Sequence, residues 1–151
     1  MPDTSDIYVI TLVVEGYTLD FDRIAEGLNL TGGNTERRGE QNDRGRVYQL
    51  DRWTHNFPVA AGLSPSARLR WLRTHLQPAS SFLHDLRAKA DVKLIYTAYT
   101  FGYKHQALFD REALALCVEM DIPLEIKFIK FDPPLESLIE DFETTTEGAV
   151  T

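Results

Sequence analysis

The chain has little of what several common protein classes depend on. Among its 151 residues there is one cysteine, Cys117, so the chain cannot close a disulfide on itself. No apolar run approaches the roughly 20 residues that cross a bilayer. The first residues, MPDTSD, lack the basic and then apolar order of a secretory signal. We therefore predict a soluble protein of the cytoplasm with no membrane partner.

The chain has no excess of positive charge, since 23 acidic residues outnumber 16 lysines and arginines and the formal net charge is −7. Nucleic-acid backbones are bound by lysine and arginine, so this charge argues against a nucleic-acid partner. The acidic residues gather at the end of the chain, because residues 132–151 contain no lysine or arginine and carry most of the net charge. We therefore divide the chain into a single domain, residues 1–131, and an acidic tail, residues 132–151.

The sequence contains no recognisable catalytic, metal or cofactor pattern. None of the four histidines has a second one four residues away, the spacing that places two metal ligands on one helix face. Cys117 lies in the apolar run ALALCVEM, which predicts a core thiol and not a nucleophile. The glycine-rich stretch TGGNTERRGE lacks the ending of a phosphate-binding loop. We predict no catalytic residue, no metal site and no cofactor, which favours a non-catalytic protein.

What the sequence does contain is an alternation of strand and helix patterns. Segments rich in β-branched and aromatic residues predict strands at Ile7–Val14, Arg46–Thr54, Val92–Phe101 and Ile122–Phe131. The first and third of these are apolar on both faces, as expected of central strands. Between the second and third, Ser64 followed by Pro65 begins a pair of helices that extends to about Ala90.

The tripeptide FDR occurs twice, and it marks a structural repeat only after a shift of two residues. Aligning Asp20 with Asp110 gives each following helix an acidic N-cap. The apolar residue before each cap is then placed to pack four positions into its helix, as Leu19 on Ile24 and Phe109 on Leu114. Two such strand–helix–strand halves predict an α+β fold, a ferredoxin-like duplicated split βαβ unit with a four-stranded, mainly antiparallel sheet. Two inserted helices and a C-terminal acidic helix complete the prediction.

These motifs also resemble a known family. An apolar first strand, Leu19-Asp20 at the start of a helix, Gly39-Glu40 ahead of a strand ending in Trp53, and a helical middle rich in leucine and proline resemble the bacterial domain-of-unknown-function family 4279 (DUF4279). The resemblance spans roughly Tyr8–Phe131 and leaves the acidic tail outside. It implies no defined activity and, for some members, a role as immunity proteins encoded beside toxin genes.

Candidate partner-binding residues come from two regions. Arginine and tryptophan are enriched at interface hot spots, and an acidic helix suits a basic partner. The candidates are Arg52, Trp53, Arg68, Trp71, Arg73, Glu136, Glu140, Asp141 and Glu143. The alternative is that both tryptophans belong to the core and the arginines only solubilise a helix face. The amphipathic segment Leu135–Phe142 either docks its apolar side on the domain or displays its acid to a partner.

For function, the sequence favours a non-catalytic, protein-binding module, most concretely an immunity-type inhibitor that blocks a basic toxin. The alternative is a small-ligand sensor or enzyme with a pocket between the sheet and the inserted helices. In that case Arg37 and Arg38 of the glycine-rich stretch are the candidates for holding an anionic ligand. The identity of the partner, the oligomeric state and the role of Gly32-Gly33 stay open at this point.

Overall fold

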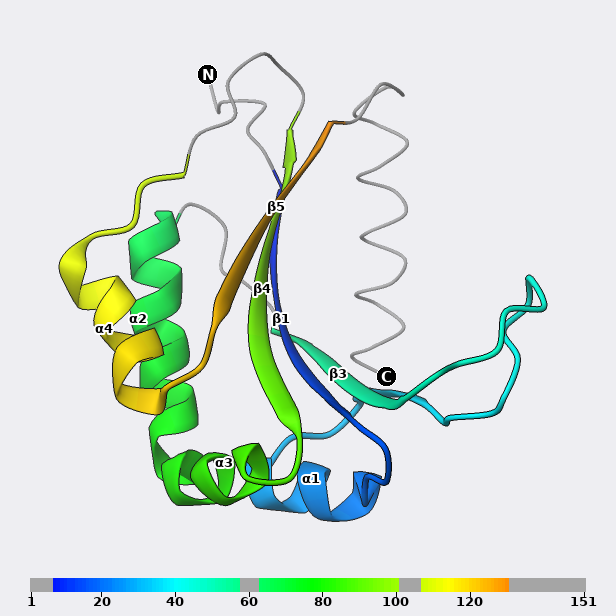
Figure 1. The fold of residues 1–151 in the computed structure, drawn as a ribbon. Helices are drawn as coiled ribbons and strands as arrows, with labels where there is room; N and C mark the ends of the chain where they lie inside the picture. Colours follow the sequence, from blue (N-terminus) through cyan, green and yellow to red (C-terminus); the bar gives the residue numbers. More distant parts are fainter. Residues whose placement is uncertain (1–6, 58–62, 101–106, 131–151) are drawn as a thin grey trace.

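The computed structural model describes residues 7–57, 63–100 and 107–130 (Figure 1). In this part of the chain a sheet is covered on one face by α2 and α4, while α1 and α3 close its lower end. The elements in chain order are β1 (Ile7–Gly16), α1 (Phe21–Leu28), β2 (Asn34–Glu36), β3 (Asp51–Phe57), α2 (Pro65–Leu76), a 3₁₀ turn (Gln77–Ala79), α3 (Ser80–Arg87), β4 (Asp91–Thr100), α4 (Arg111–Met120) and β5 (Leu124–Lys130). The predicted acidic helix and tail lie outside the described residues.

The sheet has five strands in the order β2-β3-β1-β4-β5. β1 pairs antiparallel with both β3 and β4, and β4 pairs parallel with β5. The prediction that the first and third long strands are central is confirmed, because β1 and β4 each have a strand on both sides. Their apolar composition follows from this position: Leu12 and Val13, on opposite faces of β1, are both fully buried.

The α+β class and the mainly antiparallel pairing are confirmed, because three of the four strand pairs are antiparallel. The predicted number of strands is wrong, since the sheet has five and not four: β2 forms inside the glycine-rich stretch TGGNTERRGE. The ferredoxin-like duplication is not confirmed. In a split βαβ unit another strand separates the two strands of each half. Here β3 lies directly beside β1, and β5 directly beside β4.

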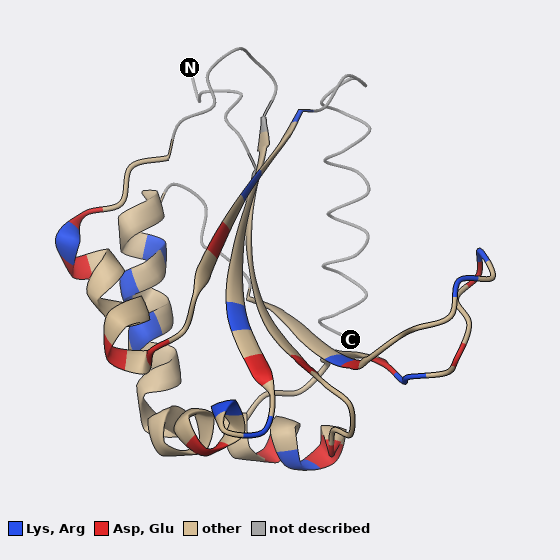
Figure 2. Cartoon of the chain, viewed as in Figure 1, with Lys and Arg blue, Asp and Glu red and all other residues tan. Residues whose placement is uncertain are grey.

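The reason is the difference between the connections in the two halves. α4 leads almost directly into β5, so it acts as a crossover that returns the chain parallel to β4. After α1 and β2, residues 37–50 make a long excursion that reverses the chain before β3, which then runs antiparallel to β1. Figure 2 shows positive and negative residues interspersed along this excursion. β3 also starts later than predicted, at Asp51.

The predicted helix caps are confirmed. The side chain of Asp20 accepts a hydrogen bond from the Arg23 N–H at 3.1 Å. Asp110 accepts one from the Ala113 N–H at 2.8 Å. Both carboxylates thereby satisfy backbone donors that have no partner within the helix. The two helices also end alike, each at a residue in the left-handed conformation.

The predicted packing of the apolar residue before each cap agrees with the repeat in the first half but not in the second. Leu19 and Ile24 are both buried members of the core. In the second half, Phe109 packs edge-on against Tyr96 with 5.2 Å between ring centroids, whereas Leu114 is 43% exposed. The repeat therefore holds for the backbone caps, which need only local residues, and not for the side-chain packing around them.

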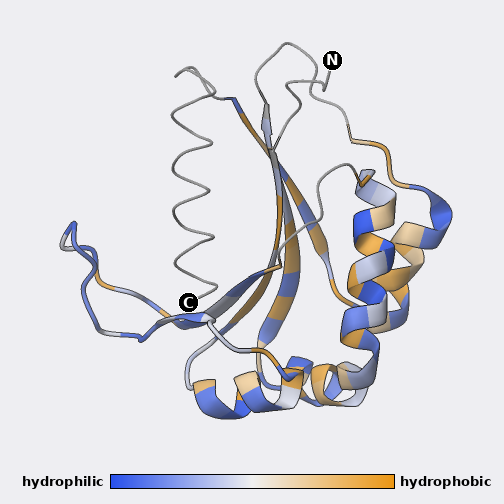
Figure 3. Ribbon diagram, turned by 180° about the vertical axis from the view of Figure 1, so that it is seen from behind, coloured by the Kyte–Doolittle hydropathy of each residue, from blue (hydrophilic) through white to orange (hydrophobic). Residues whose placement is uncertain are grey.

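The main core lies between the sheet and the helices. On α2, Leu69, Leu72 and Leu76 form an apolar side that is fully buried in one cluster with residues of β1 and β4. Burying a leucine side chain stabilises a fold by roughly 1.5–3 kcal/mol, so α2 is firmly fixed on the sheet. Figure 3 shows the apolar residues along the strands and on the helices. None of the helices within the described ranges is long and apolar enough to span a bilayer.

Candidate functional site

A row of five aromatic rings connects β3 with α2. Trp53, His55 and Phe57 alternate along β3 and therefore point to the same face of the sheet. Their neighbouring ring centroids lie 6.0 Å and 4.9 Å apart. Trp71 and His75, four residues apart on α2, stack on each other at 5.3 Å, and both lie in T-shaped arrangements with Phe57. We call these five residues the aromatic row.

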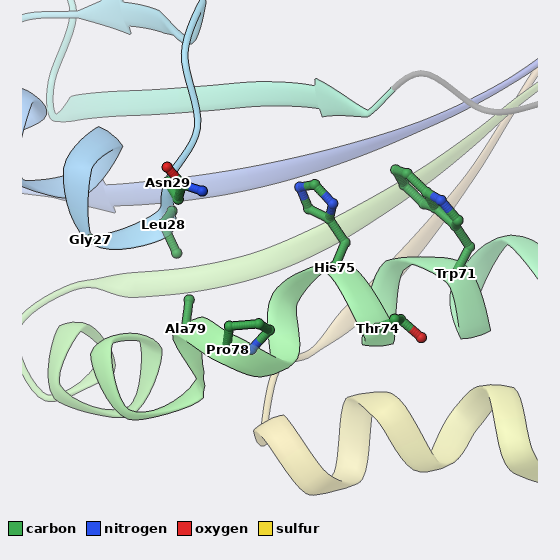
Figure 4. Close-up of a pocket in the computed structure, with 8 residues that line it drawn as sticks. All are labelled: Gly27, Leu28, Asn29, Trp71, Thr74, His75, Pro78 and Ala79. Atoms are coloured by element: carbon green, nitrogen blue, oxygen red, sulfur yellow. The ribbon is translucent and has the colours of Figure 1, made fainter.

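The aromatic row begins in the core and ends at the surface. Trp53 and Phe57 are 2% and 3% exposed, whereas Trp71 is 40% exposed. Trp71 and His75 line a groove of about 410 Å³ together with the end of α1 and the turn that follows α2. Figure 4 shows these side chains around the groove, whose lining residues are Gly27, Leu28, Asn29, Trp71, Thr74, His75, Pro78 and Ala79.

The groove is suited to recognition by shape and ring contacts. Its lining contains no aspartate, glutamate, lysine, arginine or cysteine. His55, in the same aromatic row, is half-buried; burial, and secondarily the neighbouring His75, lower its pKa. His55 is therefore mainly neutral near pH 7. A planar or apolar group fits this lining better than a charged one, because aromatic rings prefer stacked or edge-on contacts.

The sequence-predicted tryptophan and arginine candidates separate into two groups. Trp53 and Arg68 are buried, and Arg68 donates from Nε to the Leu63 carbonyl at 2.8 Å. Trp71 lies at the groove. Arg73 pairs with Glu119 at 2.8 Å, and Arg52 lies 3.8 Å from Glu15, with all four side chains partly in solvent. The acidic candidates Glu136, Glu140, Asp141 and Glu143 lie outside the described residues.

The buried carboxylate of Asp51, which is 2% exposed, binds the side chain of the loop candidate Arg37 and the backbone of the loop candidate Arg38. Its Oδ2 accepts the Leu19 N–H at 2.9 Å and an N–H of the Arg37 guanidinium at 3.1 Å. Its Oδ1 accepts the backbone N–H of Arg38 at 2.7 Å. Arg37 also lies over the ring of Phe21 at 4.1 Å. We call this arrangement the Asp51 anchor. In the anchor, the side chain of Arg37 helps to tie the β2–β3 connection to the start of α1.

The Asp51 anchor keeps its carboxylate charged. Burial alone raises the pKa of Asp51, but the backbone donors of Arg38 and Leu19, helped by the Arg37 charge, outweigh burial and leave this pKa below its ordinary value. An ionised carboxylate with three donors is chemically satisfied. The anchor is therefore structural, and it lacks the unmet hydrogen-bonding capacity expected of a ligand site.

Gly32 and Gly33 have a local role that the sequence left open. Gly32 has a φ of +77°, which residues with a Cβ rarely adopt. A Cβ on Gly33 would lie 2.7 Å from Nε1 of Trp53, closer than side chains approach one another. The glycine pair thus lets the chain turn and then pass directly over the indole that begins the aromatic row.

The remaining reactive side chains form no second site in the described residues. Cys117 is half-buried, and burial raises the pKa of its thiol, which leaves it mainly protonated and poorly nucleophilic. Within residues 7–57, 63–100 and 107–130, no three histidine, cysteine, aspartate or glutamate side chains gather as they would around a metal ion. Of the two other histidines, His84 lies on α3 and His105 falls outside the described residues.

Sequence reasoning missed His55, Phe57 and His75 as members of one site. The available signal was the alternation of Trp53, His55 and Phe57 in a strand, together with the four-residue spacing of Trp71 and His75 in a helix. Neither pattern shows that the strand and the helix face each other, which only the fold reveals.

Comparison with known proteins places the chain in a family. The sequence model of a family described as a domain of unknown function (DUF4279) matches residues 5–129, most of the chain. The chain belongs to this family, so the resemblance inferred from the sequence motifs is confirmed. No curated protein matches the chain, and no solved structure does.

Proposed function

We propose that this DUF4279 member is a cytoplasmic, non-catalytic protein-binding module that contacts its partner through Trp71 and the adjoining groove. The observation that carries the proposal is the state of Trp71, which is 40% exposed and yet held between His75 and Phe57. A large ring fixed in place before binding loses little conformational freedom on binding. Tryptophans in such positions are frequent hot spots of protein interfaces.

The charge of the chain supports a basic partner, and an immunity-type inhibitor of a basic bacterial toxin is the form of the proposal that fits best. The net charge of −7 attracts positively charged proteins and speeds their association. In this proposal the acidic tail gives long-range attraction, while Trp71 and the groove provide the short-range contact. Blocking a partner by binding requires no reacting groups, which agrees with the uncharged lining of the groove.

Trp71→Ala is expected to weaken the complex by about 2 kcal/mol or more, roughly a thirtyfold rise in Kd, while the protein stays folded. The partner tested is a basic, toxin-like protein that the wild-type chain binds, sought first among the products of adjacent genes, with affinity measured by calorimetry. Tyr17→Ala is the matched control, because Tyr17 is an aromatic residue that is 70% exposed and does not line the groove. Equal affinities of wild type and Trp71→Ala would contradict the proposal.

Deletion of residues 132–151 is expected to leave a folded domain and to weaken binding of the basic partner, most strongly at low salt. The segment holds six acidic residues and no basic ones, so its attraction is screened as the ionic strength rises. Circular dichroism checks the fold, and calorimetry at two salt concentrations checks the affinity. Unfolding of the shortened domain would show instead that the tail is structural.

The second candidate function is a small-ligand sensor or enzyme. The groove of about 410 Å³ favours it, because this volume falls in the range of roughly 300–1,000 Å³ common for small-molecule sites, and because the inserted helix α2 forms one wall. A thermal-stability screen against nucleotides and metabolites separates the two functions. Large, saturable stabilisation by one compound, lost in Trp71→Ala, would favour the ligand-binding function.

A further inference from the structure

The outer edge of β5 has a defined hydrogen-bonding pattern. Among the described strands β5 pairs only with β4, in parallel, with Leu94 opposite Leu124. The Leu94 N–H donates to the Pro123 carbonyl at 2.9 Å. In a parallel ladder alternate residues of a strand bond to the same neighbour. The odd-numbered residues of β5 therefore direct their backbone groups toward β4, and Leu124, Ile126 and Phe128 direct theirs outward.

The outer edge of β5 is apolar, whereas natural sheets usually place charged residues, proline or a covering segment at an edge strand to prevent pairing with another chain. Ile126 and Phe128, on the helix-facing side, are each 42% exposed. α4, the crossover that leads into β5, leaves Leu114 and Val118 43% and 78% exposed. β5 has seven residues and contains no proline. Long, apolar edge strands are normally covered or paired, and contiguous exposed apolar residues indicate an interaction surface.

The sequence of β5, LEIKFIK, is complementary to itself in one antiparallel register. With Ile126 opposite Ile126 of a second copy, Leu124 faces Phe128 and Glu125 faces Lys127. The outward-directed even residues then form the hydrogen-bonded pairs. Glu125 and Lys127 fall at the non-hydrogen-bonded positions, where opposing side chains are closest and opposite charges stabilise the pair.

The neighbouring registers are unfavourable. A shift of two residues in either direction places Glu125 opposite Glu125 or Lys127 opposite Lys127, and like charges directly opposite each other destabilise a strand pair. A shift of one residue places the apolar helix-facing side chains opposite those of the other sheet face. The charges of Glu125 and Lys127 thus disfavour the other registers and select one register for pairing with a second copy of β5.

We propose that the chain forms a two-fold symmetric dimer in which β5 pairs antiparallel with β5 of a second copy about Ile126. The two sheets become one continuous sheet, and both helix layers lie on the same face. Such a dimer buries part of the exposed side chain of Ile126 against its counterpart. The groove beside Trp71 is formed by α1 and α2 and remains accessible, so the dimer is independent of the proposed function.

The dimer is tested with the full chain by analytical ultracentrifugation over a range of concentrations. The wild type is expected to approach twice the chain mass of 17.2 kDa as concentration rises. Glu125→Lys and Lys127→Glu each place like charges at both crossing pairs, and each is expected to weaken self-association about tenfold or more. Lys89→Glu, an exposed charge reversal near the end of α3, is the control that leaves the dimer unchanged.

Mixing the two single variants gives the decisive measurement. A Glu125→Lys chain has lysine at both positions and a Lys127→Glu chain has glutamate at both, so opposite charges face each other when the two combine. We expect the mixture to form a heterodimer, although each variant alone is mainly monomeric. Circular dichroism confirms that both are folded, since Glu125 also lies 3.1 Å from Lys93 within its own chain. A monomeric wild type, a dimer insensitive to either reversal, or a mixture that stays monomeric would overturn the proposal.

Discussion

Trp53→Ala is expected to lower the free energy of unfolding by about 3–5 kcal/mol, the usual cost of removing a large buried aromatic side chain. Trp53 is 2% exposed and belongs to the main core. Its indole stacks on His55 and is passed closely by Gly33. Its removal leaves a cavity between β3 and the turn at Gly33 that precedes β2. The strand and the turn cannot move together to fill this cavity without breaking the β2–β3 pair. Urea denaturation followed by circular dichroism measures the effect.

The same substitution at Trp71 is the natural control. Trp71 is 40% exposed, so its replacement leaves no enclosed cavity and is expected to cost about 1 kcal/mol or less. The two tryptophans thus separate stability from binding: loss at position 53 destabilises the fold, and loss at position 71 weakens the complex. Equal destabilisation by the two variants would show that Trp71 is a core residue and would remove the main support for the binding surface.

Asp51→Asn is expected to lower the free energy of unfolding by about 2–3 kcal/mol at neutral pH, because it replaces a charged acceptor by a neutral one. The amide keeps the volume of the carboxylate but offers one oxygen where two now accept three donors. Asp20→Asn is the matched control, since Asn caps a helix as well as Asp does. An Asp51→Asn protein as stable as the wild type would contradict the assignment of the anchor as structural.

The anchor also predicts how stability depends on pH. The pKa of Asp51 is lower in the folded protein than its ordinary value of 3.8, so the unfolded chain takes up the proton first as the pH falls. The contribution of the charged carboxylate is fully present above the unfolded value and is lost as the pH falls toward and through the folded one. The stability difference between wild type and Asp51→Asn is therefore expected to be constant from pH 7 to about pH 5 and to shrink below about pH 4. Urea midpoints at several pH values provide the test.

Local features of the fold were predictable from the sequence because they depend on residues close together in the chain. Asp20, Asp110 and Ser64 cap their helices as predicted, since a cap needs only the three residues that follow it. The central places of β1 and β4 also follow from composition, because only strands with two covered faces are apolar on both. The parallel β4–β5 pair did not follow, because it depends on how α4 crosses the sheet.

Buried Asp51 shows why the rest of the site was missed. The sequence placed this aspartate inside a predicted strand, where it is ordinarily an exposed residue. It is buried because Leu19 and Arg38, distant along the chain, both direct backbone donors at it. Arg37 looked available for a ligand for the same reason, since the partner of its guanidinium could not be recognised from the sequence. A pattern of residue types records side-chain chemistry and not the backbone groups that a fold brings together.

The pairing of β1 with β4 has a consequence for how the protein is made. Ile7 lies opposite Tyr99, so the middle of the sheet joins the beginning of the described chain to a segment far along it. Contacts between such distant residues slow folding, because a large loop must close before they are gained. During synthesis β1 leaves the ribosome long before β4, so β3 can pair with one edge of β1 while the edge that will pair with β4 stays open. The nascent chain therefore passes through an intermediate with an unpaired, apolar strand edge. Such an intermediate is prone to aggregation and is the stage at which chaperone binding matters most.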